Sequence, residues 1–248
     1  MPPVVLGIDT SSSWCSAALS RGSELYVRRA EVGNAHSQRI LAMVDEILGE
    51  AGITLAGCDA IAFSAGPGSF TGLRVGCAVA QGLAYGACLE VAAIGTLDAI
   101  ARAAAVADGW KAPTLLAAQD ARMGDVYWAL FEQVDGRLVA VAGPALAPPL
   151  ALRDRLRALR DERPVAIGCG NAWAVHGAAM HGLVERVDER ETADAADVAA
   201  LGVLATLDRH LTPPAQAAPL YVRNEVARTT IQRQADRARS WPDRQMTS

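Results

Sequence analysis

Short apolar runs separated by polar turns dominate the beginning of the chain. Residues 4–9 form an apolar run that ends in the turn composition Asp-Thr-Ser-Ser-Ser. Residues 15–20 and 25–30 follow, and the Arg-Gly-Ser-Glu sequence between them is typical of a hairpin turn. The pattern predicts three antiparallel strands.

Residues 34–50 change to a helical period. At 100° per residue, their apolar positions cover an arc of about 160° on one side of a helix. The arc consists of Ile40, Leu41, Met43, Val44, Ile47 and Leu48. We expect a helix whose apolar face is wide enough to serve both its own core and a neighbour.

A glycine-rich loop separates the next expected strand, residues 60–64, from a second helix, residues 72–85. Small residues recur every four positions on this helix, at Gly72, Gly76, Ala80 and Ala84. Glycine inside a helix costs roughly 0.5–1 kcal/mol relative to alanine, so the stripe needs a reason. Close approach of another backbone is the simplest reason, and that backbone belongs either to the chain's own sheet or to a partner's helix.

The second half of the chain repeats the beginning of the first. After a strand at 91–94, a helix at 96–107 and a boundary at 108–113, a strand ends in Asp120, and an Asp-Gly turn then joins two further strands. The elements expected beyond Asp120 are strands at 126–134, 137–141 and 165–167 and helices at 150–160, 171–180 and 194–209. This internal echo indicates a duplicated domain.

Three antiparallel strands followed by alternating helices and strands, repeated once, are the pattern of the actin and sugar-kinase superfamily. The sequence therefore predicts an α/β fold with two ribonuclease-H-like lobes, at residues 1–108 and 109–228. Residues 229–248 are rich in arginine and poor in apolar side chains, which predicts a disordered tail. The fold alone does not identify a substrate.

Composition narrows the class of protein. The chain of 248 residues carries a net charge of -4, which argues against binding nucleic acid by bulk electrostatics but leaves a local basic patch open. No apolar run reaches the roughly 20 residues of a membrane span, and no signal peptide is evident. The five cysteines form no C-x-x-C pair. Together these features predict a cytoplasmic protein with buried free thiols.

The sequence contains neither a phosphate-loop motif nor a pair of histidines spaced to bind a metal ion. Lys111 is the only lysine and lies between Trp110 and Ala112, so the chain lacks the Gly-Lys-Ser/Thr ending of a phosphate loop. A two-histidine metal site on a helix needs spacing of four, and Ile40 stands four residues after His36. We expect no metal site.

Two segments are candidates for a degenerate nucleotide site. Asp9, Thr10 and Ser11 lie at a strand end, where an aspartate followed by hydroxyls could orient a magnesium-bound nucleotide. Gly66 and Gly68 belong to the glycine-rich loop that opens a helix, where free N–H groups favour anions. The alternatives are a capped turn and a purely structural loop, and the sequence leaves both open.

Five segments together resemble the TsaB (YeaZ) family. They are residues 7–11 (GIDTS), 36–41 (HSQRIL), 66–74 (GPGSFTGLR), 120–127 (DARMGDVY) and the closing 219–223 (PLYVR). The resemblance implies a subunit of the bacterial machinery that makes threonylcarbamoyladenosine at position 37 of tRNAs reading codons that start with A. It implies two ribonuclease-H-like lobes and a non-catalytic role.

The family pairs with its paralogue TsaD, which holds the metal and transfers threonylcarbamoyl, and an ATPase subunit, TsaE, joins them. The paralogue's metal helix carries His-x-x-x-His, whereas this chain has Ile40 at the second position. The expected nucleotide turn of this chain also lacks the glycine that active superfamily members have. The resemblance therefore implies no cofactor on the chain alone, ATP only within the complex, and indirect contact with tRNA.

The family also implies a partner surface on the two N-terminal helices. The residues expected there are His36, Ile40, Met43, Ile47, Gly72, Leu73, Gly76 and Ala80. Without the paralogue, the same surface is expected to form a homodimer. The alternatives are an ATP-binding kinase or metal-dependent transferase of the same fold, and a self-contained homodimeric scaffold.

Overall fold

The computed structural model describes residues 2–160, 165–188 and 190–223. The expected tail at 229–248 lies outside these ranges. The strands are β1 (Val4–Asp9), β2 (Trp14–Arg21), β3 (Glu24–Glu31), β4 (Ala60–Gly66), β5 (Glu90–Gly95), β6 (Thr114–Asp120), β7 (Val126–Val134), β8 (Arg137–Ala147), β9 (Val165–Cys169) and β10 (Val184–Val187). The α-helices are α1 (His36–Ala51), α2 (Phe70–Ala87), α3 (Thr96–Ala107), α4 (Pro149–Arg160), α5 (Ala172–Met180) and α6 (Ala195–Leu207), with short 3-10 turns at Leu55–Gly57 and Pro214–Gln216.

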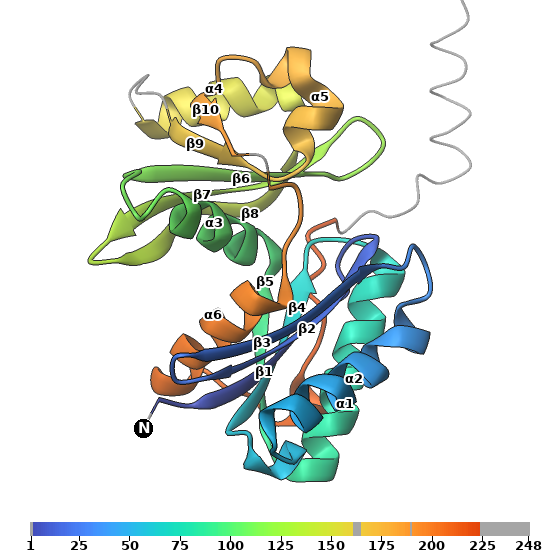
Figure 1. The fold of residues 1–248 in the computed structure, drawn as a ribbon. Coiled ribbons are helices and arrows are strands. Elements are labelled where there is room, and N and C mark those ends of the chain that lie inside the picture. The colour runs from blue at the N-terminus through green and yellow to red at the C-terminus, as the bar shows by residue number, and fades with distance from the viewer. Residues whose placement is uncertain (1, 161–164, 189, 224–248) are drawn as a thin grey trace, which may run out of the picture.

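The two halves of the chain form sheets of the same topology. The first sheet has the order β3-β2-β1-β4-β5 and the second β10-β9-β6-β7-β8, which is the same order counted from the other edge. In each, the first three strands are antiparallel and the last two run parallel to the first. This confirms the predicted duplication and the two-lobed, actin-like α/β fold (Figure 1).

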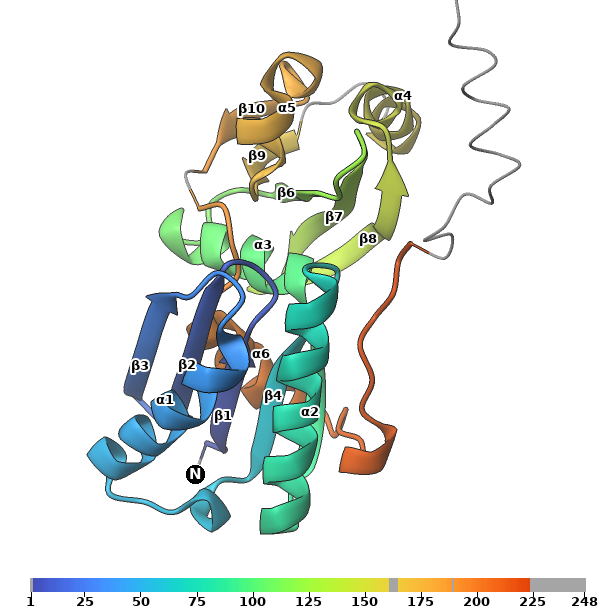
Figure 2. The same cartoon turned by 90° about the vertical axis from the view of Figure 1, so that its right-hand side faces the viewer.

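Helices cover both faces of each sheet. In the N-terminal lobe, α1 and α2 lie side by side on one face and α6 lies on the other (Figure 2). In the C-terminal lobe, α4 and α5 cover the outer face and α3 packs beneath the sheet, between the lobes. Strand β1 is buried almost throughout because it is covered from both sides, as central strands of such sheets are.

Two helices make contacts across the predicted lobe boundaries. Helix α3, expected in the N-terminal lobe, packs against β6 to β9 of the second sheet as well as β4 and β5 of the first. Helix α6, expected in the C-terminal lobe, packs on β1, β2 and β4, and Ala195 N donates to Ser16 Oγ at 2.9 Å. The chain after residue 195 thus returns to the first lobe, and one apolar cluster runs through both.

The individual elements otherwise lie close to their predicted positions, with three differences. Strand β8 continues to Ala147, beyond the predicted end at 141, and the short edge strand β10 was not predicted. Four cysteines are buried free thiols as expected, whereas Cys88 is exposed. Within the described ranges, no helix is long and apolar enough to cross a bilayer.

Candidate functional site

The turn after β1 brings three of the predicted nucleotide-site residues together. Asp9 ends the strand, and its Oδ1 accepts hydrogen bonds from the backbone N of Ser11 at 3.3 Å and from Ser11 Oγ at 2.7 Å. Asp9, Thr10 and Ser11 are all buried. A turn in which an aspartate side chain accepts from the backbone N–H two residues later is a capped turn.

The glycine-rich loop closes directly over this turn. The backbone N of Ser69 donates to Ser11 O at 2.7 Å, and Thr10 Oγ1 donates to Gly72 O at 2.7 Å. The loop has no room for side chains here, since a Cβ on Gly68 would lie 2.6 Å from Ser11 O. Gly68 therefore lies against Ser11, whereas Gly66 lies against the backbone of Leu220 and the side chain of Leu73, and the chain's own backbone fills the space over the turn.

Backbone N–H groups in the first turn of α2 donate to Ser69 of the same chain. Ser69 caps the helix by accepting from the backbone N of Gly72 at 3.3 Å, and its carbonyl accepts from the N of Leu73 at 2.8 Å. Capping residues of this kind satisfy the N–H groups that would otherwise attract an anion. Of the two interpretations that the sequence left open for the loop, the geometry favours the structural one.

Asp9 is the most strongly perturbed carboxyl of the turn. Its Oδ2 and the neighbouring Ser64 Oγ are buried and complete no hydrogen bond within the described part of the chain. Burial raises the pKa of Asp9 to about 6, against the lowering influence of the hydrogen bonds from Ser11, and the carboxylate of Asp194 raises this pKa further. The pKa of this carboxyl therefore lies closer to neutral pH than that of an exposed aspartate, because burial disfavours its charged form.

His36 holds the same turn from the other side. Its ring is buried, and Nε2 lies 2.9 Å from Ser12 O. Because a carbonyl oxygen only accepts, Nε2 carries the hydrogen and donates it. Among the residues that the structure describes, no group of three His, Cys, Asp or Glu side chains could hold a metal ion. His36 acts here as a hydrogen-bond donor to the turn.

Replacing His36 by alanine should destabilise the fold by about 1–3 kcal/mol, because the bond to Ser12 O is lost at a buried position. Urea unfolding followed by circular dichroism measures the loss. His181→Ala, at an exposed histidine, is the control. Equal stability of the two variants would contradict the assigned role.

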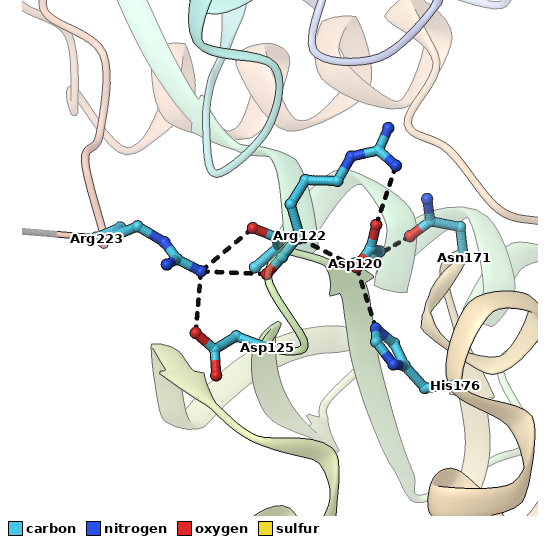
Figure 3. Close-up of polar contacts among 7 residues, drawn as sticks. Asp120, Arg122, Asp125, Asn171, His176 and Arg223 are labelled. Carbon is cyan, nitrogen blue, oxygen red and sulfur yellow. Dashed lines mark hydrogen bonds and ion pairs between the residues drawn. The ribbon is translucent and has the colours of Figure 1, made fainter. Parts of the chain in front are cut away.

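The second lobe carries a related turn at the end of β6 (Figure 3). Asp120 Oδ1 accepts from the backbone N of Arg122 at 3.1 Å, as Asp9 does from Ser11. Its carboxylate also lies 3.0 Å from His176 Nε2, and its backbone N donates to Asn171 Oδ1 at 2.8 Å. Sequence reasoning noted the strand-ending Asp120 but missed His176 and Asn171, which come from the α5 region more than fifty residues later.

The segment after residue 216 ties the two lobes together. The backbone N of Leu220 donates to Ala65 O, at the end of β4, at 2.7 Å. Three residues later, Arg223 reaches the β6–β7 loop, where it donates to Asp125 Oδ2 at 3.0 Å and to the carbonyl of Ala121 at 3.2 Å (Figure 3). We call residues 217–223 the strap.

The residues of the predicted partner surface lie inside the chain. All eight of its residues are buried within the chain itself: His36, Ile40, Met43, Ile47, Gly72, Leu73, Gly76 and Ala80. The small-residue stripe faces the chain's own Thr10 turn, since a Cβ on Gly76 would lie 2.5 Å from Thr10 Oγ1. Apart from the half-exposed Leu41, the wide apolar arc packs in the chain's own core. The partner surface itself stays a prediction.

Comparison with known proteins identifies the family. The tRNA threonylcarbamoyladenosine biosynthesis protein TsaB of Escherichia coli is 36% identical over 225 residues, which cover 90% of this chain and 96% of that protein. The chain belongs to the TsaB family. TsaB of Haemophilus influenzae is 34% identical over 235 residues, with 90% and 94% coverage.

The structural and family-model comparisons agree with membership of the TsaB family. YeaZ from Pseudomonas aeruginosa matches with a TM-score of 0.78 and 32% identity, over 88% of this chain and 99% of the solved one. A family model described as TsaD: tRNA N6-adenosine threonylcarbamoyltransferase matches residues 30–156. The chain is thus a TsaB homologue of tRNA threonylcarbamoyladenosine biosynthesis with an actin-like fold.

Proposed function

We propose that this TsaB homologue is a non-catalytic, cytoplasmic subunit that binds the TsaD paralogue and supports threonylcarbamoyl transfer to adenosine 37 of tRNAs reading ANN codons. The observation that carries the proposal is the closed turn. Where superfamily enzymes hold phosphate and metal, Ser69 N bonds Ser11 O and Thr10 Oγ1 bonds Gly72 O. A site filled by its own backbone suits a partner subunit better than a kinase or a metal-dependent transferase.

The exposed side of α2 is the best candidate for the TsaD-binding face. It presents the small residues Ala78 and Gly82 and the largely exposed Tyr85, which is 80% accessible. On the adjacent α1, Leu41 is 48% exposed. Small and apolar side chains on two neighbouring helices allow close helix packing (Figure 2). Self-association in the absence of TsaD is expected to use the same face.

Ala78→Arg is expected to weaken TsaD binding at least tenfold, because a long charged side chain on the exposed face of α2 would block close helix packing. The matched control is Leu159→Arg, which places the same charge on the exposed face of α4. Sedimentation of each variant with TsaD, and threonylcarbamoylation of tRNA by the reconstituted TsaB–TsaD–TsaE set, are the measurements.

Two results would contradict the proposal. One is a reconstituted set that modifies tRNA equally well with and without this chain. The other is ATP hydrolysis by the isolated chain that disappears on Asp9→Asn, since that would place a working nucleotide site at the closed turn.

A further inference from the structure

Two half-exposed aromatic rings and an arginine form a cluster where α2 begins. Phe70 and Tyr221 have ring centroids 5.8 Å apart and are 52% and 46% exposed. The Arg74 guanidinium lies 3.9 Å above the Phe70 ring, and its Nε donates to Tyr221 Oη at 3.1 Å. Within the described ranges Arg74 forms no ion pair, so its terminal nitrogens remain available for an anion.

The strap extends this cluster to the second lobe. Tyr221 belongs to the cluster, and Arg223, two residues on, contacts the β6–β7 loop. In that loop Arg122 and Met123 have left-handed backbone angles of φ 62° and 57°, which residues with a Cβ adopt only when contacts hold them there. Arg223 provides such contacts at the carbonyls of Ala121 and Arg122.

In the β6–β7 loop the negative side chains are largely buried and the positive side chain of Arg122 is exposed. The carboxylate of Asp120 is almost fully covered and that of Asp125 is three-quarters covered, whereas the Arg122 side chain is 89% exposed. Figure 3 shows the Arg122 side chain extending away from Asp125, with its guanidinium paired to Asp120 at 3.4 Å. The outward charge is therefore positive, on a chain whose net charge is -4. We call Phe70, Arg74, Arg122, Tyr221 and Arg223 the arginine–aromatic surface.

We propose that the arginine–aromatic surface contacts RNA, specifically the tRNA on which the complex acts. The inference rests on the proposed function for the identity of the RNA. Guanidinium groups bind phosphate through paired N–H donors, and RNA bases that leave the helix stack on aromatic rings and on guanidinium planes. Arg74, which forms no ion pair within the described ranges, provides both contacts beside the half-exposed rings. Arg122 pairs with Asp120 at 3.4 Å, but its side chain is 89% exposed and adds a second guanidinium that a phosphate can reach.

RNA suits this surface better than a protein partner for an electrostatic reason. An anionic polymer supplies an acceptor at every nucleotide, and the two most accessible guanidiniums, Arg74 and Arg122, lie on different lobes. The strap fixes these lobes relative to each other, so successive phosphates could bridge them. A protein that binds the same face is the competing outcome of the test below.

The test is the double variant Arg74→Ala/Arg122→Ala in the reconstituted complex with TsaD and TsaE. We expect the KM for an unmodified transcript of an ANN-reading tRNA to rise roughly tenfold or more, with kcat changed little, because phosphate contacts contribute to binding. The slope of log affinity against log salt should become shallower by about one for each arginine. Phe70→Ala should raise the KM without changing the salt slope.

Arg155→Ala/Arg157→Ala is the matched control, since both arginines are exposed on α4 and the change in charge is the same. Circular dichroism and sedimentation with TsaD verify folding and assembly of each variant. Unchanged KM and salt slope in a folded, assembled double variant would overturn the proposal while leaving the proposed function intact. Loss of TsaD or TsaE binding by the double variant would also overturn it, by making this face a protein interface.

Failure of the proposed function is distinguishable from failure of the RNA proposal. If the wild-type complex does not modify tRNA, direct binding of the labelled transcript to that complex still measures the contact. Ultraviolet crosslinks between the transcript and Phe70 or Tyr221 are expected, and their absence together with unchanged affinity of the double variant would reject RNA binding by this surface.

Discussion

Asp9→Asn is expected to stabilise the protein at neutral pH by on the order of 3 kcal/mol, because the native structure keeps this carboxyl in a buried site that disfavours its charge. An amide has the shape of the acid. Its oxygen can keep the bonds from Ser11, and its NH2 group can donate to Ser64 Oγ, which now has no partner in the described structure.

The sign of the pH dependence follows from the pKa of Asp9. In the unfolded chain the carboxyl ionises near 3.8, whereas burial raises the pKa in the folded state to about 6. Below pH 3.8 both states are protonated and the contribution is fully present. As the pH rises from 3.8 through about 6, the unfolded state ionises while the folded state stays largely protonated, so the contribution is lost; above this range both states are ionised and the difference stays constant. Asp9→Asn removes this loss.

Denaturant unfolding of wild type and Asp9→Asn between pH 4.5 and 8 tests the expectation. The difference in the free energy of unfolding should grow in favour of the variant up to about pH 7 and then level off. Asp45→Asn, on the exposed side of α1, is the control for the loss of one negative charge. Parallel curves with the variant less stable throughout would mean that the native turn needs the charged carboxylate.

The repeated fold could be predicted because its signals are local. An apolar run that ends in Asp9 and another that ends in Asp120 each precede a hairpin, and the structure gives both the same place at the centre of a sheet. Helix α1 was predicted to within a few residues from its apolar period. Patterns of period two and 3.6 depend on neighbours in the sequence, so one sequence suffices to reveal them.

The candidate site could be predicted only in part, because its contacts join distant segments. Asp9 and Gly68 were predicted as parts of one site, but the closure of the loop over the turn depends on hydrogen bonds between segments about sixty residues apart, from Ser69 N to Ser11 O and from Thr10 Oγ1 to Gly72 O. His176 approaches Asp120 from 56 positions away, at a kink in α5 where its φ is -117°. Nothing local to either residue announces the pair.

The helix stripe shows why the period of a pattern does not identify its neighbour. Close backbone approach was predicted along the stripe, from the chain's own sheet or from a partner's helix, and the structure shows it at Gly72, whereas Gly76 meets the side chain of Thr10. The structure places Thr10 of the same chain against both. The period of a pattern indicates which positions are buried, but only the fold determines which residues pack against them.

Gly72→Ala should therefore destabilise the isolated chain by about 3 kcal/mol or more, since overpacking against backbone cannot be relieved by rotating a side chain. An added Cβ would overlap the Thr10 carbonyl oxygen, so the turn or the helix would have to shift. That shift would break the bond from Thr10 Oγ1 to Gly72 O and disturb the bond from Ser69 N to Ser11 O.

Gly82→Ala, on the same helix, is the matched control because an added Cβ there meets nothing within 4 Å. Alanine is the better helix former, so this variant should be more stable than wild type by about 0.5–1 kcal/mol. Chemical unfolding of the two variants as isolated proteins should thus give changes of opposite sign. If Gly72→Ala keeps wild-type stability and loses only TsaD binding, the stripe belongs to the interface after all, and the close contact with Thr10 is not a feature of the free chain.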